Sequence, residues 1–503
     1  MNPSVVKYLI TLTLCMVAAV FLGFTVGSGE FQYLFLLSYL LLLGFMIAVP
    51  GNIPLLALGL ISPFILPLPF VRAVPFLLLI LGLIAVKYFF QNLVHRNEKH
   101  PLTGALTVGF GLFFGWVALR YAMKPSLPNL SGIGPTVTGF RAYLNYALCF
   151  LLLLALPRLL HTPADLQRLL QWMGKIALFF ILLLLPFAAT KSLTAAAWLD
   201  RFGLTVALFD NGFLRFVALP PLGVLLVTLA CLKHVWPLKK WQRAAFWGLG
   251  LAAVFAGGSR AGIILLFTCV LAILLIQRRY VWLLLTGLAA GLLWTAFYFV
   301  GETIPVRGEI GYLRVLSVAS PRISRLTNAE GTYLWRKVRW QRAMEEIKNN
   351  PVFGKGYGGL ENAWIFSESL YQDAVVDIDL AAGSIHNGFL ACAYSLGLPA
   401  LMLFGLAYAQ QLYANHVRSR KFAENDPLIS DLHTFIGANL AGLAPSIYVG
   451  NDLNNSMLWL LLGLGVLLAR MKDKSPMVAP QTAAEPPPIR NSGSLPFGQV
   501  QAG

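Results

Sequence analysis

Charged residues are scarce in this sequence. Asp, Glu, Lys and Arg make up 12% of its 503 residues, against about 25% in soluble globular domains. Hydrophobic residues make up 57%, and apolar runs recur from Tyr8 to Leu468. So little charge excludes an ordinary soluble enzyme. We predict an all-α integral membrane protein, built as one continuous helical bundle.

Acidic residues are scarcer still than basic ones. The chain has 21 Asp and Glu against 38 Lys and Arg, for a formal net charge of +17. The basic residues lie mostly in short loops between apolar runs, which is typical of a multi-span membrane protein and not of nucleic-acid binding. The five cysteines fall inside apolar runs without a C-x-x-C spacing, so we expect neither a disulfide nor a zinc site. The expected partners include membrane lipids and exclude nucleic acid.

The apolar runs set the number of membrane spans. Each span needs about 20 apolar residues, and the runs predict about 12–14 transmembrane helices. The count is open around residues 51–72, where repeated prolines favour a re-entrant or kinked segment. The spans are predicted at 8–27, 32–50, 53–71, 73–90, 104–122, 143–160, 176–190, 213–232, 244–258, 261–276, 281–300, 386–413, 432–449 and 456–470.

Lys and Arg concentrate in alternate short loops, which places those loops in the cytoplasm. Both termini are then cytoplasmic, and the long connection between spans is periplasmic. The predicted regions are 1–300, N-terminal transmembrane helices; 301–385, a large, partly helical periplasmic loop; 386–474, C-terminal transmembrane helices; and 475–503, a disordered cytoplasmic tail.

The long loop is basic in its first half, although Lys and Arg normally concentrate in cytoplasmic loops and not in periplasmic ones. Tyr333–Gly358 carries Arg336, Arg339 and Arg342 on a predicted helix that Pro351 ends, followed by a turn containing Gly354 and Gly356. Guanidinium groups match phosphate geometry, so this segment could bind an anion. An amphipathic helix lying on the membrane or a solvated charged loop explains it equally well.

Two further arginines fall at predicted outer boundaries of spans. Arg260 lies in the turn Gly257–Gly262, and Arg215 follows Asp210-Asn211-Gly212. Each could bind an anionic headgroup. Each could equally snorkel to the membrane surface.

His386 is the one histidine that the predicted topology places on the periplasmic side of the membrane. It stands beside Asn387 and Gly388, where the long loop re-enters the membrane. A lone histidine is usually structural. The ordinary pKa of histidine nevertheless suits a general base, and no other histidine is available on that side.

These motifs together resemble those of the O-antigen ligase and O-antigen polymerase superfamily of bacterial envelope glycosyltransferases. The resemblance covers about Ala244 to Gly405, a third of the chain, and rests on the order and spacing of several short segments. They are Ser259-Arg260-Ala261-Gly262, Arg336 with Trp340 and Ala343, Asn350 to Gly358, His386 to Leu390, and Leu396 to Pro399.

The resemblance implies a GT-C-like, metal-independent, inverting glycosyltransferase without a cofactor, in the bacterial inner membrane. Its donor would be a glycan linked to undecaprenyl diphosphate, and its active site would face the periplasm. The long loop, 301–385, would carry catalytic elements, and His386 would be the catalytic base. The diphosphate would be bound by Arg260, Arg336, Arg215 and Arg339, with Asn387, Gly354 and Gly356 in support.

Three acceptors fit the resemblance. A ligase transfers to lipid A-core, a polymerase of O-antigen or exopolysaccharide transfers to a lipid-linked repeat, and a protein O-oligosaccharyltransferase transfers to a protein. A D-x-D sequence, Asp377-Ile378-Asp379, is weak evidence for a metal site and is typical of a solvated acidic loop. The competing class is a transporter or flippase, which predicts ionisable residues inside spans or inverted repeats. The proline-rich run alone favours that class.

Overall fold

The computed structural model describes residues 53–62, 65–68, 71–75, 77, 80–82, 108–125, 139–190, 206–208, 214–304, 317, 319–326, 329–357, 380, 385–450, 453 and 455–473. Helices dominate this part of the chain, with two short antiparallel hairpins beside them. The architecture confirms the predicted all-α membrane protein.

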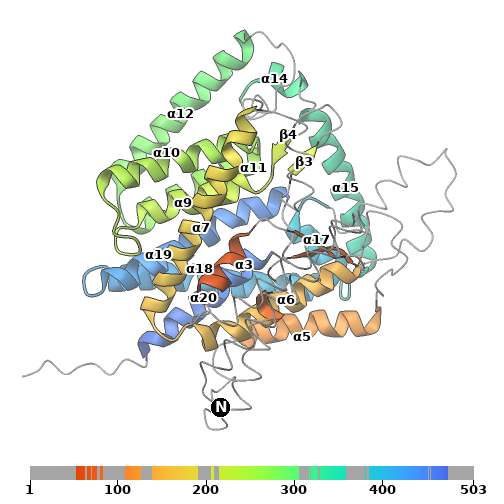
Figure 1. The fold of residues 1–503 in the computed structure, drawn as a ribbon. Helices are drawn as coiled ribbons and strands as arrows, with labels where there is room; N and C mark the ends of the chain where they lie inside the picture. The colour runs from red at the N-terminus through yellow and green to blue at the C-terminus, as the bar shows by residue number, and fades with distance from the viewer. Residues whose placement is uncertain are drawn as a thin grey trace, which may run out of the picture.

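The helices form one bundle, in which α12 lies along the upper edge, α5 along the lower edge and α15 at the right (Figure 1). They are α3 (Ile53–Ile61), α5 (Val108–Met123), α6 (Gly139–Leu159), α7 (Pro163–Thr190), α9 (Leu219–Cys231), α10 (Lys240–Ala256), α11 (Arg260–Ile276), α12 (Tyr280–Thr303), α14 (Pro321–Leu326), α15 (Ala329–Asn349), α17 (Gly388–Leu396), α18 (Leu398–Phe422), α19 (Pro427–Val449) and α20 (Ser456–Asp473). The hairpins pair β1 (Ile65–Leu68) with β2 (Val71–Pro75), and β3 (Val206–Leu208) with β4 (Leu214–Phe216).

Three helical segments of the described ranges are long and apolar enough to cross a membrane. They are Ala142–Leu159, Pro163–Ala188 and Tyr280–Thr303, and Leu219–Cys231, Arg260–Ile276 and Ser456–Met471 are shorter apolar helices. The predicted spans at 8–27 and 32–50 lie outside the described residues.

The structure corrects three predicted boundaries. The run at 53–71 is not one span: α3 ends at Ile61, two residues before Pro63, and a hairpin follows, because proline blocks helix continuation. The predicted start of a span at residue 176 is wrong, since α7 already begins at Pro163 and residues 163–175 are helical; their cytoplasmic side stays a prediction. The predicted span at 386–413 divides into α17 and α18 at Gly397, whose φ is 88°.

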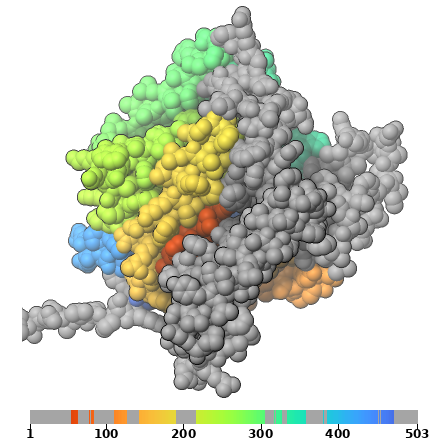
Figure 2. Space-filling model, viewed as in Figure 1, coloured from red at the N-terminus to blue at the C-terminus, as the bar shows by residue number. Residues whose placement is uncertain are grey.

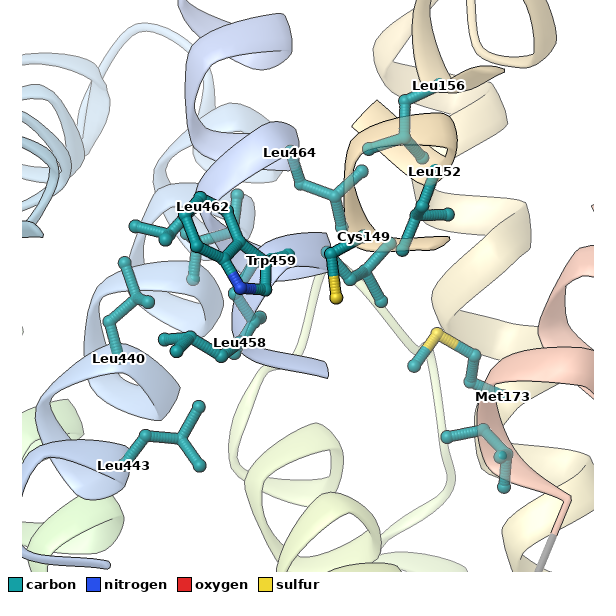
Figure 3. Packing of buried hydrophobic residues seen from close by; sticks show 14 of the residues in the cluster. Cys149, Leu152, Leu156, Met173, Leu440, Leu443, Leu458, Trp459, Leu462 and Leu464 are labelled. Atoms are coloured by element: carbon teal, nitrogen blue, oxygen red, sulfur yellow. The ribbon is translucent and has the colours of Figure 1, made fainter. Parts of the chain in front are cut away.

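Apolar packing of α20 against its neighbours forms the centre of the bundle. Trp459 is fully buried, and its ring lies 5.2 Å from that of Phe113 and 6.0 Å from that of Phe404. Figure 3 shows Trp459 and Leu464 of α20 close to Cys149 of α6. On the face seen in Figure 2, α3 lies directly against α7.

Glycines permit the closest helix contacts. A Cβ on Gly223 of α9 would lie 2.4 Å from the carbonyl oxygen of Gly250 on α10. A Cβ on Gly442 of α19 would meet the Cys269 sulfur of α11, whereas one on Gly437 would face Ile276 at 3.5 Å. The sequence numbers run in opposite directions along this contact, so α11 and α19 are antiparallel. The first turn of α11 therefore lies near the end of α19.

Candidate functional site

Within the long loop, Ala329–Asn349 folds as α15, which packs against α17 (Figure 1). Ala343 of α15 is fully buried in an apolar cluster with Ile385, Ala391 and Tyr394. Trp340 packs on this cluster, while Met344, four residues further along the helix, is 48% exposed. The helix is thus held by the protein on its Trp340 and Ala343 side, which a helix lying only on the membrane would not require.

His386 stands between α15 and α17 in an unusual backbone conformation. Its φ is 54°, in the left-handed region that few residues other than glycine adopt. Both neighbours are fixed: Trp340 Nε1 donates to the Ile385 carbonyl oxygen at 3.0 Å, and the Asn387 side chain caps α17 by accepting from Leu390 N at 3.1 Å. Such backbone conformations concentrate at functional sites, where the surrounding contacts maintain them.

Two arginines of α15 lie close to His386. Arg339 is only 7% exposed, and its guanidinium stacks over the Trp335 ring at 5.0 Å. Arg336 Nη1 donates to the Val449 carbonyl oxygen at 2.9 Å, at the last residue of α19. Burial, followed by the charges of Arg336 and Arg339, lowers the pKa of His386 to about 4. We call His386, Arg336 and Arg339 the histidine–arginine cluster.

Arg342, the third arginine of the step-by-three series, lies elsewhere. Its side chain is 50% exposed and pairs with Glu345 at 3.6 Å. The two arginines nearer the start of α15 are therefore the ones that the helix directs toward His386.

Arg260 lies at the same end of the bundle as this cluster. It begins α11, whose N-cap Ser259 accepts from Gly262 N at 3.4 Å. Because α11 and α19 are antiparallel, this turn is level with the end of α19, where Arg336 binds Val449. Arg215 lies on β4 next to Phe216, whose carbonyl oxygen would be 3.1 Å from a Cβ on Gly257. The hairpin and the Arg260 turn are thus adjacent.

Gly354 and Gly356 lie at the opposite end of α17 from His386. Lys355 N donates to Tyr394 O at 2.7 Å, and Gly356 N donates to Ser395 O at 3.0 Å. Both glycines have positive φ, and a Cβ on Gly354 would lie 2.6 Å from the Tyr394 carbonyl oxygen. These glycines shape a turn that binds the end of α17, and nine helical residues, about 13 Å, separate them from the histidine–arginine cluster.

The turn has a partner that the motifs did not indicate. Arg120, in the last turn of α5, is only 6% exposed and donates from Nη2 to the Gly354 carbonyl oxygen at 3.2 Å. A basic residue near the end of an apolar run gave no local signal beyond membrane snorkelling.

The other described histidines gather at the far end of the bundle. His234 pairs with Asp431 at 3.0 Å and its carbonyl oxygen accepts from Gln167, while His433 contacts Asn415 at 2.8 Å. None of these groups faces the histidine–arginine cluster. Asp377 and Asp379 lie outside the described residues, and no three His, Cys, Asp or Glu side chains of the described ranges form a metal-binding group.

The fold and the cluster define a helical membrane protein with fixed positive charge around a half-buried histidine. Residues 244–405 match the family described as O-Antigen ligase. This match confirms the resemblance to the O-antigen ligase and polymerase superfamily, and it includes Arg260, Arg336, Arg339 and His386. None of the curated proteins compared with the chain matches it. The matched region supports a ligase-type glycosyltransferase acting on lipid-linked glycans in general.

Proposed function

We propose that this protein transfers a glycan from undecaprenyl diphosphate to an acceptor sugar hydroxyl at the periplasmic face of the bacterial inner membrane. The observation that carries the proposal is the histidine–arginine cluster: a half-buried imidazole in a constrained backbone conformation, beside two guanidinium groups. It supplies a proton acceptor and an anion site at one place.

The proposed reaction is a single displacement. His386 takes the proton of the acceptor hydroxyl, and the oxygen attacks the anomeric carbon. The bond from that carbon to the diphosphate oxygen breaks, and undecaprenyl diphosphate leaves with the electron pair. Arg336 and Arg339, joined by Arg260 and Arg215 at the same end, stabilise the leaving charge without a metal ion. One displacement inverts the anomeric configuration.

Electrostatics link proton transfer to donor binding. With a pKa of about 4, the imidazole of His386 is neutral at pH 7 and can accept a proton, but it is a weak base. A bound diphosphate would offset the charges of Arg336 and Arg339, which raises this pKa. His386 would therefore become a stronger base when the donor is in place.

Reconstituted transfer tests the proposal. Full-length protein in detergent, supplied with a lipid-linked glycan and an acceptor, should form a new glycosidic bond. His386→Ala should reduce the rate by about 10²–10⁴-fold, whereas His416→Ala, which changes a histidine near Arg278 and Arg420, should not. Movement of the lipid across a membrane without a new glycosidic bond would instead identify a flippase.

The acceptor is identified by glycan analysis in cells. In a deletion strain, a free lipid A-core with retained lipid-linked polymer identifies a ligase, and capping by a single repeat identifies a polymerase. Loss of glycan from a protein identifies a protein acceptor.

The side of the membrane on which the long loop lies is tested by a cysteine at Ser367 in a cysteine-free background. Labelling by an impermeant reagent only after the inner membrane is lysed would contradict the proposed topology.

A further inference from the structure

Arg120 is a buried cation that has no counter-ion within the described part of the chain. Its side chain is 6% exposed, and among the described residues no carboxylate pairs with it. One hydrogen bond, from Nη2 to Gly354 O, is its direct contact there, while Nε is buried and makes none. A guanidinium taken out of water is costly unless an anion accompanies it.

Several polar groups surround this guanidinium. Tyr143 on α6 is 6% exposed, its hydroxyl lies against the backbone of Tyr357, and it is close enough to Arg120 to interact with its charge. The Tyr357 ring lies edge-on to the Tyr143 ring at 5.2 Å. A Cβ on Gly356 would lie 2.9 Å from Arg120 Nη2, so the glycine keeps the space beside the guanidinium open.

Two lysines lie on the exposed side of the polar groups around Arg120. Lys124, one turn after Arg120, is exposed, and its Nζ donates to Lys355 O at 3.5 Å. The Lys355 ammonium pairs with Glu346 at 2.9 Å, whereas Arg120 and Lys124 have no carboxylate partner among the residues that the structure describes. A buried guanidinium, an outer ammonium and a tyrosyl hydroxyl together suit a phosphate group.

We propose that Arg120, Lys124 and Tyr143, beside the turn at 354–357, bind a phosphate group of the acceptor lipid. The proposal rests on the proposed function, in which the histidine–arginine cluster holds the donor. The two sites lie at opposite ends of α17, whose nine residues span about 13 Å. That separation allows acceptor sugars to extend from a phosphate at Arg120 toward the hydroxyl that His386 deprotonates.

Binding stoichiometry tests the second site. Inorganic pyrophosphate is titrated calorimetrically into the full-length protein in uncharged detergent, and the wild type should bind two equivalents. Arg120→Gln should lose one of them, with about ten- to hundredfold weaker binding, and Arg336→Gln should lose the other. Arg168→Gln, which removes a cation whose side chain is 69% exposed, is the matched control and should retain both.

Transfer kinetics distinguish phosphate binding at this site from a purely structural role of these residues in holding the turn. Arg120→Gln and Lys124→Gln should raise the KM for the acceptor and leave the KM for the donor unchanged, and Arg120→Lys should recover part of the loss. Lys124 is exposed, so its variant is informative even if the Arg120 variants fold poorly. Equal acceptor KM in Lys124→Gln and wild type would overturn the proposal.

The source of the phosphate is resolved by the acceptor used. A shift in KM with a lipid-linked repeat, or with phosphorylated lipid A-core but not its dephosphorylated form, supports the site and names the ligand. Displacement of the second pyrophosphate by phosphatidylglycerol nanodiscs, with no shift in acceptor KM, would show a bulk-lipid site and refute it. One equivalent in the wild type, lost in Arg336→Gln, would refute the second site alone, whereas an unaffected Arg336→Gln would refute the proposed function.

Discussion

The pH dependence of transfer gives the sharpest test of His386. In the free enzyme the pKa of His386 is about 4, so about one molecule in a thousand carries an imidazolium at pH 7. The imidazolium has no lone pair to accept a proton, and the rate must therefore fall as the pH drops through this pKa. The acid limb of kcat/KM should lie near pH 4, well below the ordinary histidine value of about 6.5.

Two shifts of this limb follow from the arginine charges. Because kcat reports the donor complex, where diphosphate offsets the charges, its acid limb should lie at higher pH than that of kcat/KM. Arg336→Gln removes one charge that lowers the pKa, so the kcat/KM limb should also move to higher pH, although the donor binds less tightly. Arg342→Gln, on the same helix but paired with Glu345 in solvent, should leave the limb in place.

The assay is initial-rate transfer in detergent from pH 3.5 to 8, with folding at each pH monitored by circular dichroism. His386→Gln keeps a hydrogen-bonding side chain but cannot take up a proton, so it should lose about 10²–10⁴ in rate and show no acid limb. Near wild-type turnover in His386→Gln would show that His386 only positions the acceptor. A limb at pH 6.5 that Arg336→Gln does not move would refute the electrostatic reasoning.

Three other variants follow from the geometry. Arg260→Lys should raise the KM for the donor by about tenfold or more, because an ammonium cannot bind phosphate in a bidentate way; equal donor KM would remove Arg260 from the site. Gly354→Ala should lower the melting temperature and the rate, since its φ is 63° and the new Cβ would lie 2.6 Å from Tyr394 O, at a cost of about 1–3 kcal/mol. Gly223→Ala should overpack α9 against α10, at a cost in stability of about 1–3 kcal/mol, and so lower the melting temperature in detergent. Gly287→Ala adds a methyl group where there is open space and should be neutral or slightly stabilising. Similar melting temperatures for these two variants would contradict the packing.

The sequence alone determined the class of protein. The lengths of apolar runs and the charges of short loops are local properties, and a bilayer accepts few other solutions than helices for such runs. Helix α15 was equally local, since its periodicity and Pro351 predict its course and its end. The choice of His386 came from the predicted topology, in which the charges of short loops assign the other histidines to the opposite side.

Tertiary structure decided which residues meet. Arg336 and Arg339 lie close to His386, while Arg342, three residues on, pairs in solvent, because only one face of α15 packs against α17. The glycine turn is bound at the far end of α17 by Arg120, which is 234 residues from Gly354 in the chain. Sequence spacing carries no information on such a contact, since it depends on how α5, α17 and the turn pack together and not on any local preference of the chain.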